Sequence, residues 1–182
     1  MDKVIADFAL NYASSRRIEY AEVRAHSDKS EGLVVRNGVL DAYSRTVDSG
    51  FCIRILAEGG IGFASTNKWT RDEARAIVDI AYRTARAARR RDKIRFAKER
   101  SVKIDWAVSQ KRKIDDLTPE TRIKTVTELD KALISQKINI AARMFGFGTT
   151  ITEKYFVNTE GSVISSLIPR IGAYGFITVI EN

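Results

Sequence analysis

Few side chains in this 182-residue sequence are suited to chemistry, and they are not grouped. The one histidine, His26, and the one cysteine, Cys52, each stand in a run that alternates apolar and polar residues. Zinc sites usually combine several His or Cys ligands, so this pattern predicts no metal centre. A single cysteine cannot form an internal disulfide, and we interpret Cys52 as a buried structural thiol and His26 as an exposed residue at a strand end.

Two carboxylate pairs and one glycine cluster were considered as catalytic or phosphate-binding groups. The pairs Asp115–Asp116 and Glu19–Glu22 lie in polar surroundings, where carboxylates are ordinarily solvated and keep normal pKa values. The cluster Gly59-Gly60-x-Gly62 stands between two predicted strands without a helix directly behind it, the wrong context for a nucleotide loop. We therefore predict no catalytic residue, no metal and no cofactor in this chain.

The positive charge of the chain is concentrated in one segment. The formal net charge is +8, and residues 83–103 contain ten basic and two acidic side chains, so the rest of the chain is balanced. Three arginines of this segment, Arg83, Arg86 and Arg90, are candidates for anion binding, and a nucleic-acid-binding module is one alternative function. Because Phe96 is its only aromatic residue, base stacking is poorly supplied, and a solvated basic helix end is the simpler interpretation.

The N-terminal part of the sequence changes from a helical to a strand period. Apolar residues at helical spacing predict a helix over 4–16, with Asp2 as its N-cap. From 18 to 67 the period is two, which predicts a first meander of about five antiparallel strands, too closely spaced for parallel crossovers. The turns expected between them are Asp28-Lys29-Ser30, Asn37-Gly38, Asp48-Ser49-Gly50 and Glu58-Gly59-Gly60.

Two helix-start signals and a second stretch of alternating apolar and polar residues predict the remaining elements. Thr70-Arg71-Asp72-Glu73 is typical of a capping box, so residues 70–116 are expected to form a basic helix, ending near Arg91, and a connection with one short strand. A helix over 118–135 and a second meander over 137–181 come next. The fold class is α+β: two mainly antiparallel β-meanders, which could form one large curved sheet, with about three packed helices.

Composition and hydropathy place the chain among intracellular proteins. It is 44% apolar and 30% charged, which is enough apolar material for a core. The N-terminus is too polar for a signal peptide, and no window approaches the run of about 20 apolar residues that a bilayer span needs. We expect a soluble, cytoplasmic chain without membrane contact.

The order of several short motifs resembles the N-terminal domain of the TldD/PmbA family, described as modulators of DNA gyrase. The matching segments are Tyr20-Ala21-Glu22-Val23-Arg24, Asn37-Gly38, the strand from Ser49 to Ile55, the run from Gly60 to Asn67, and Val157-Asn158-Thr159-Glu160-Gly161. Within them the family-motif residues are Gly50, Arg54, Gly62, Phe63, Ala64, Ser65, Thr66, Asn67, Asn158 and Gly161. Glycine at strand starts permits bends and close backbone approach, so we interpret these residues as mainly architectural.

The resemblance implies a role in peptide hydrolysis. Members of the family look like zinc peptidases that act on small or unfolded peptides, with an H-E-x-x-x-H-type motif after this domain. This sequence lacks that motif, so we expect zinc in a C-terminal half beyond Asn182, the chain being an excised domain or a shortened relative. The implied partners are the C-terminal catalytic domain, a homo- or hetero-dimer and a flexible peptide. A purely structural assembly domain, with sheet edges as the interface, is a further alternative.

Overall fold

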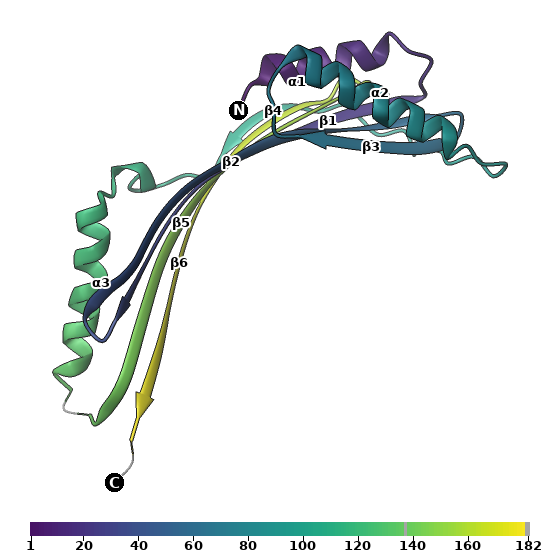
Figure 1. The fold of residues 1–182 in the computed structure, drawn as a ribbon. Helices are drawn as coiled ribbons and strands as arrows, with labels where there is room; N and C mark the ends of the chain where they lie inside the picture. The colour runs from purple at the N-terminus through teal and green to yellow at the C-terminus, as the bar shows by residue number, and fades with distance from the viewer. Residues whose placement is uncertain (137, 181–182) are drawn as a thin grey trace. The chain divides into compact units, whose positions relative to one another are not determined.

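The computed structural model describes residues 1–136 and 138–180 and has an α+β fold, as expected (Figure 1). One mostly antiparallel sheet has the strand order β3-β2-β1-β5-β6-β4, in which the short β4 lies parallel to β6. The two predicted meanders therefore belong to one sheet. The helices are α1 (Lys3–Ser14), α2 (Arg71–Ala87) and α3 (Pro119–Ile134), with a 3-10 turn, η1 (Ile114–Asp116). The strands are β1 (Tyr20–Arg36), β2 (Val39–Ala57), β3 (Gly60–Thr66), β4 (Lys103–Ala107), β5 (Ile140–Asn158) and β6 (Val163–Val179).

The first meander has three long strands, and the prediction of about five short ones was wrong. The expected turns at 28–30 and 48–50 lie inside β1 and β2, because pairing with neighbouring strands overrides local turn preference. The chain reverses at Asn37-Gly38 and at Glu58-Gly59, where all four residues have positive φ. A left-handed backbone therefore distinguishes the real turns.

The second meander has two strands joined by the predicted turn after Asn158. The short strand expected in the connection before residue 116 is confirmed as β4, and all five of its residues are exposed. The ends of this meander, at Lys137 and at 181–182, fall outside the described residues.

All three helices begin at the predicted caps. Asp2 accepts hydrogen bonds from the N–H groups of Val4 and Ile5, and Thr70 accepts one from Glu73. Thr118 caps α3 in the same way. The Glu73 carboxylate pairs with the Lys68 ammonium. None of the helices in the described part of the chain has the length and hydropathy needed to cross a membrane.

The basic helix α2 ends at Ala87, four residues before the predicted end near Arg91. Gly60, where β3 begins, lies directly under this last turn, since a Cβ there would be 2.2 Å from the Ala85 carbonyl oxygen. Beyond this point the helix has no further strand to cover. Three consecutive arginines then follow, without apolar side chains to bury.

The chain divides into two compact units, each described here by itself. Unit 1 comprises 1–27, 48–107 and 152–167, and unit 2 comprises 28–47, 108–151 and the described residues from 168 onward. Strands β1, β2, β5 and β6 contribute residues to both units.

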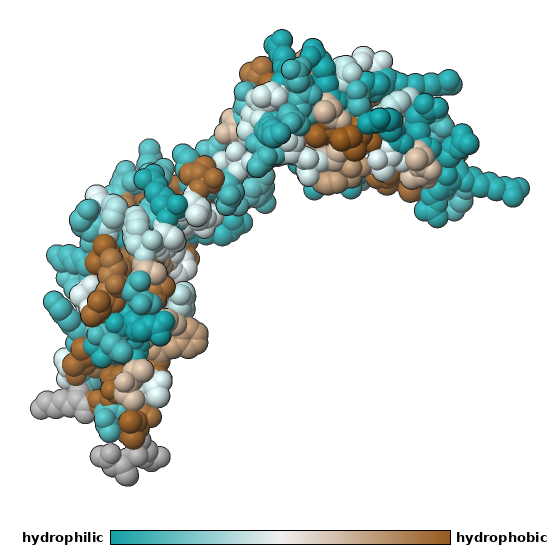
Figure 2. Space-filling model, viewed as in Figure 1, coloured by the Kyte–Doolittle hydropathy of each residue, from teal (hydrophilic) through white to brown (hydrophobic). Residues whose placement is uncertain are grey.

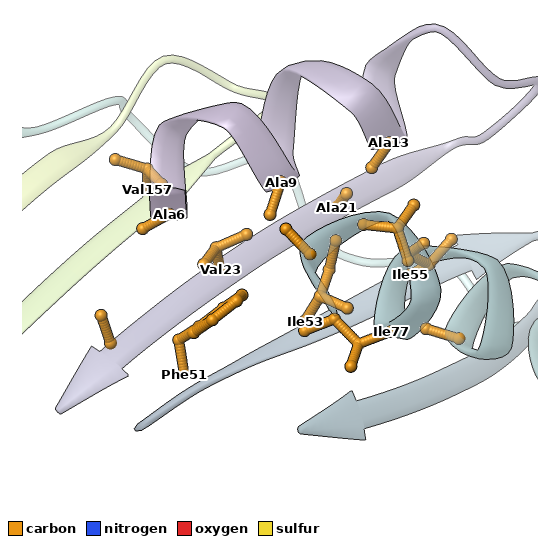
Figure 3. Close-up of a cluster of buried hydrophobic side chains, with 14 of the residues drawn as sticks. Ala6, Ala9, Ala13, Ala21, Val23, Phe51, Ile53, Ile55, Ile77 and Val157 are labelled. Carbon is orange, nitrogen blue, oxygen red and sulfur yellow. The ribbon is translucent and has the colours of Figure 1, made fainter. Parts of the chain in front are cut away.

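The core of unit 1 lies between one face of the sheet and the two helices α1 and α2 (Figure 3). Alanines 6, 9 and 13 of α1 are fully buried, so this helix lies close to the strands. The other helix, α2, lies very close to the sheet at Gly62 of β3, where a Cβ would be 1.9 Å from the carbonyl oxygen of Ala81 in that helix. The strands contribute fully buried side chains, among them Ala21, Val23, Ile53 and Ile55.

In unit 2, α3 packs on the sheet through a smaller core and two buried polar groups. The core residues are Leu33, Val35, Val126 and Phe145. Arg122, 4% exposed, donates hydrogen bonds to the carbonyls of Ile114 and Leu117, and Asp130, 2% exposed, pairs with Arg143 of β5 at 2.6 Å. Much apolar surface stays open on this unit (Figure 2). The exposed large apolar side chains include Leu129, Ile171, Tyr174, Phe176, Ile177 and Val179.

Candidate functional site

The face of the unit 1 sheet opposite α1 and α2, called here the helix-free face, carries the polar side chains of the strands. Along β2 the residues Phe51, Ile53 and Ile55 belong to the helix-covered core, so the alternating Cys52 and Arg54 point to the helix-free face. The β2–β3 register pairs Arg54 with Phe63 and Cys52 with Ser65. These residues form adjacent rows across the two strands.

A hollow of about 580 Å³ lies on this face, across β1, β2 and the end of β3. Its lining residues are Arg24, His26, Gly50, Phe51, Cys52, Phe63, Ser65, Thr66 and Asn67. A smaller hollow of about 200 Å³ shares Arg24, Cys52 and Phe63 with it. We call the two together the β1–β3 hollow. Small side chains at Cys52 and Ser65 beside large ones at Arg24 and Phe63 account for the depression.

A buried carboxylate stabilises the border of the hollow. Glu22, 5% exposed, accepts hydrogen bonds from the Tyr20 hydroxyl at 2.8 Å and from Arg24 Nε at 2.9 Å, and its Oε1 lies 2.8 Å from Arg54 Nη2. The expectation that Glu22 is solvated was therefore wrong, because two guanidinium groups and a hydroxyl compensate its burial. Two arginines share one carboxylate, which leaves an excess positive charge. Burial also raises the pKa of Tyr20 to about 12.

The basic connection after α2 crosses the helix-free face from β3 to β6. The Ile94 N–H donates to the Gly59 carbonyl, and at the other end the Val102 N–H donates to Ser162 Oγ. Between them the Phe96 ring packs edge-to-face on Tyr20, with centroids 5.1 Å apart, and under the Arg54 guanidinium. The sequence alone does not predict this role of Phe96, whose one signal is a single aromatic residue in a charged segment.

The structure brings half of the family-motif residues together and separates the others. Gly50, Phe63, Ser65, Thr66 and Asn67 line the hollow, and Arg54 lines its smaller part. The other members lie elsewhere: Gly62 and Ala64 pack toward the helices, and Asn158 and Gly161 form the β5–β6 turn.

Two chemically active side chains lie in the hollow, in positions that differ from those predicted. Cys52 is half-buried instead of fully buried, and its partial burial raises the pKa of the thiol, which disfavours the reactive thiolate. His26 is exposed, as expected, but it lies in the middle of β1 and not at a strand end, because β1 continues to Arg36.

The residues do not fit a zinc site. Within residues 1–136 and 138–180, no three His, Cys, Asp or Glu side chains are grouped so that they could hold a metal ion. The adjacent Asp115 and Asp116 lie exposed in η1. No hydrolytic step is therefore derived from these residues.

The three candidates for anion binding lie at the end of α2 and just after it. Arg86 Nε donates to the Glu58 carboxylate at 2.8 Å, which raises the pKa of Arg86, and Arg83 Nε donates to the Asp79 carbonyl. Arg90 follows the helix and is exposed. Arg86 therefore already has an anionic partner, which reduces its value as a binder of an external anion.

Part of this chain matches a known family of protein domains. Residues 21–85 match the model for PmbA/TldA metallopeptidase domain 1. A metalloprotease of Methanocaldococcus jannaschii is 22% identical over 166 residues, 90% of this chain and 36% of the relative. The chain therefore spans little more than a third of that relative's length.

Two solved structures share the fold. TldE from Thermococcus kodakarensis has a TM-score of 0.79 and 10% identity over 97% of this chain and 40% of its own. A Bacteroides thetaiotaomicron protein, whose crystal structure is named for a modulator of DNA gyrase, has a TM-score of 0.76 and 17% identity over 98% of this chain and 41% of its own. At these identities the likeness concerns the fold.

Proposed function

This chain belongs to the TldD/PmbA family, whose N-terminal domain it carries, and from that premise we propose that it is the non-catalytic, substrate-handling domain of a zinc metallopeptidase. In this proposal the zinc ion and the residues that activate water belong to a C-terminal domain outside residues 1–182. The domain contributes one wall of the peptide cavity and acts in the cytoplasm.

The observation that carries this proposal is the larger part of the β1–β3 hollow, which five family-motif residues line. Phe63 and Ser65 alternate with the core-facing Gly62 and Ala64, so their side chains are on the helix-free face and outside the buried core. A motif that served packing alone would be expected on the other face, as Gly62 is. Their position therefore supports contact with a ligand.

The edge position of β3 supports a peptide as that ligand. β3 is the outermost strand on its side of the sheet, and its last residues line the hollow. An extended peptide beside β3 could pair its backbone with this edge, which requires little sequence preference and no folded substrate. Alternate peptide side chains would then project toward the helix-free face.

The test uses an unstructured fluorogenic peptide and the 182-residue chain with zinc. We expect the chain alone to bind the peptide without hydrolysing it, and hydrolysis to require the zinc-bearing domain in the same reaction. Turnover by the chain alone, after removal of contaminating peptidases, would contradict the non-catalytic assignment. Failure to bind any unstructured peptide would contradict the substrate-handling role.

A role in assembly is the second candidate function, and the exposed apolar surface of unit 2 supports it. Residues 168–179 of β6 expose Ile171, Tyr174, Phe176 and Ile177, and an apolar groove of about 680 Å³ lies between α3 and strands β5 and β6. Exposed apolar strands of this kind are usually covered by a partner. Sedimentation at several concentrations tests this: a homo- or hetero-dimer should dissociate when Phe176 is changed to Lys, whereas a strict monomer excludes the role for this chain.

The structure gives the nucleic-acid alternative little support. The one aromatic side chain of the basic segment, Phe96, packs on Tyr20 and under Arg54, which leaves less of its ring for stacking on a base. Phosphate contacts would remain, and they would make binding strongly dependent on salt. Absence of binding to duplex and single-stranded DNA at low salt would eliminate this function.

A further inference from the structure

The β1–β3 hollow combines a cationic border with apolar walls. Arg24 and Arg54 face one carboxylate, Glu22, which is buried and also accepts the Tyr20 hydrogen bond. The residues that line the larger hollow include no acidic side chain. The Phe63 ring, 56% exposed, stands directly opposite Arg54 across the two strands.

This combination selects a carboxylate that lies close to an apolar group. An arginine side chain recognises carboxylates through parallel N–H donors, and the Arg24 side chain is 60% exposed although its Nε donates to Glu22. The Phe63 and Cys52 side chains, on the same hollow, offer contacts to an apolar group. The volume of about 580 Å³ falls within the range of small-molecule sites.

A peptide can supply such a carboxylate from its C-terminus or from an acidic side chain. In the last residue of a peptide, the carboxylate and the side chain leave the same Cα, so both can enter one hollow. In an extended internal segment, successive side chains point to opposite faces, and two on the same face are about 7 Å apart. The compact hollow therefore fits the terminal residue better.

We propose that the β1–β3 hollow binds the C-terminal residue of a peptide, with its carboxylate on Arg24 and an apolar side chain against Phe63 and Cys52. This assignment rests on the proposed substrate-handling function and names the part of the peptide that the domain recognises. It gives the family-motif residues of this face a specific ligand.

The test measures the affinity of the 182-residue chain for labelled hexapeptides by fluorescence anisotropy. Three peptides share a sequence and an N-terminal label: one ends in Leu with a free carboxylate, one ends in Leu amide, and one ends in Glu amide. We expect the free acid to bind about tenfold more tightly than the Leu amide, as is usual for a charge-assisted hydrogen bond.

Two variants locate the carboxylate. Arg24→Gln should reduce the affinity for the free acid to the level of the amide and leave the amide affinity unchanged, a coupling that a general loss of structure would not produce. Arg36→Gln, the same substitution at another exposed arginine of β1 whose Nε also pairs with a carboxylate, is the matched control and should change neither affinity. Phe63→Ala should weaken both peptides equally.

The outcomes separate this proposal from the proposed function. Equal binding of the Leu acid and the Leu amide overturns the carboxylate assignment and leaves peptide handling intact, and this arm needs no variant. Binding of the Glu amide as tightly as the free acid overturns the terminal assignment in favour of a side chain. Binding of none of the three peptides contradicts the substrate-handling function itself.

Discussion

The two faces of the unit 1 sheet are made by the same strands but have opposite chemistry. On the helix-covered face, small or branched apolar residues such as Ala21, Val23 and Ile53 are fully buried. On the helix-free face, the alternating positions hold Glu22, Arg24 and Arg54, joined by ion pairs. The comparison shows that period-two alternation here separates a packed apolar face from a polar, ion-paired face.

Small residues have different uses on the two faces. Gly62 allows α2 to lie against β3, since any side chain there would meet the helix backbone. Gly50 is also close to backbone, since a Cβ there would be 2.8 Å from the Thr66 carbonyl oxygen. Cys52 and Ser65 instead line space that no side chain of the described residues fills, and this space is the β1–β3 hollow. A small residue is therefore structural where an element covers it and is available to a ligand where none does.

Substitution of two phenylalanines on neighbouring strands should show the largest difference between the faces in the free energy of unfolding. Phe51, 3% exposed, packs on Trp69, whereas Phe63 is 56% exposed. Phe51→Ala should lower the free energy of unfolding by about 3 to 4 kcal/mol, because it leaves a cavity in the core. Phe63→Ala should change it by less than about 0.5 kcal/mol. Urea unfolding measures both, and equal losses would contradict the distinction between the faces.

A smaller loss is expected where a glycine permits close packing. Gly62→Ala places a methyl group 1.9 Å from the Ala81 carbonyl oxygen, so α2 must move. We expect the free energy of unfolding to fall by about 3 kcal/mol, the upper part of the range for overpacking. Gly172→Ala is the control, since no atom lies within 4 Å of its added Cβ. If both variants unfold at the same urea concentration, the close packing of α2 on Gly62 does not determine stability.

The ion pairs of the helix-free face should contribute less to the free energy of unfolding than the apolar core does. Glu22→Gln keeps the shape but leaves Arg24 and Arg54 without their carboxylate. We expect a loss of about 2 kcal/mol, below that of a fully buried pair because both arginines are partly exposed. The same substitution at Glu128, which forms an exposed pair with Lys124, should cost less than about 0.5 kcal/mol. Thermal unfolding at neutral pH compares the two, and a small loss at Glu22 would show that the network is dispensable.

The smallest expected effect is a loss of stability at alkaline pH, which comes from one tyrosine on each face. Burial raises the pKa of both Tyr20 and Tyr155 from 10.0 to about 12, and each hydroxyl also donates to a carboxylate. Because the folded state holds these protons more tightly, their stabilisation is complete below pH 10 and is lost as the pH rises to 12. We expect each tyrosine to contribute about 1 kcal/mol of this loss.

Variants assign the alkaline loss to the two residues. Tyr20→Phe and Tyr155→Phe should each remove about half of the decrease in unfolding free energy between pH 10 and pH 12. Unfolding of each variant at three pH values in this interval provides the measurement. A decrease that neither substitution alters would have to come from other groups.

Local patterns in the sequence predicted the elements well where the signal is short-range. The caps at Asp2, Thr70 and Thr118 start helices as expected, because a cap depends on residues within one turn. The Asn37-Gly38 turn was predictable for the same reason. The turns predicted at 28–30 and 48–50 were wrong, because turn-forming residues continue as strand when neighbouring strands pair with them.

The site was predictable only in part. The role of the family-motif residues from Gly62 to Asn67 stays a prediction, and their alternation alone does not say which face of the sheet the helices cover. Glu22 was misjudged, because its partner Arg54 is 32 positions away in the sequence and becomes its neighbour only through the pairing of the strands. The role of Phe96 was missed for a similar reason, since it reaches Tyr20 across the sheet.

The sequence by itself determined the α+β class, the helix starts, the Asn37-Gly38 turn and the concentration of charge in residues 83–103. These properties depend on neighbours along the chain, so composition and spacing specify them. Only the tertiary structure decided that α1 and α2 share one face of the sheet, that a buried carboxylate joins two arginines on the other, and that small residues there leave a hollow. Those features depend on contacts between residues remote in sequence, which the folded backbone alone brings together.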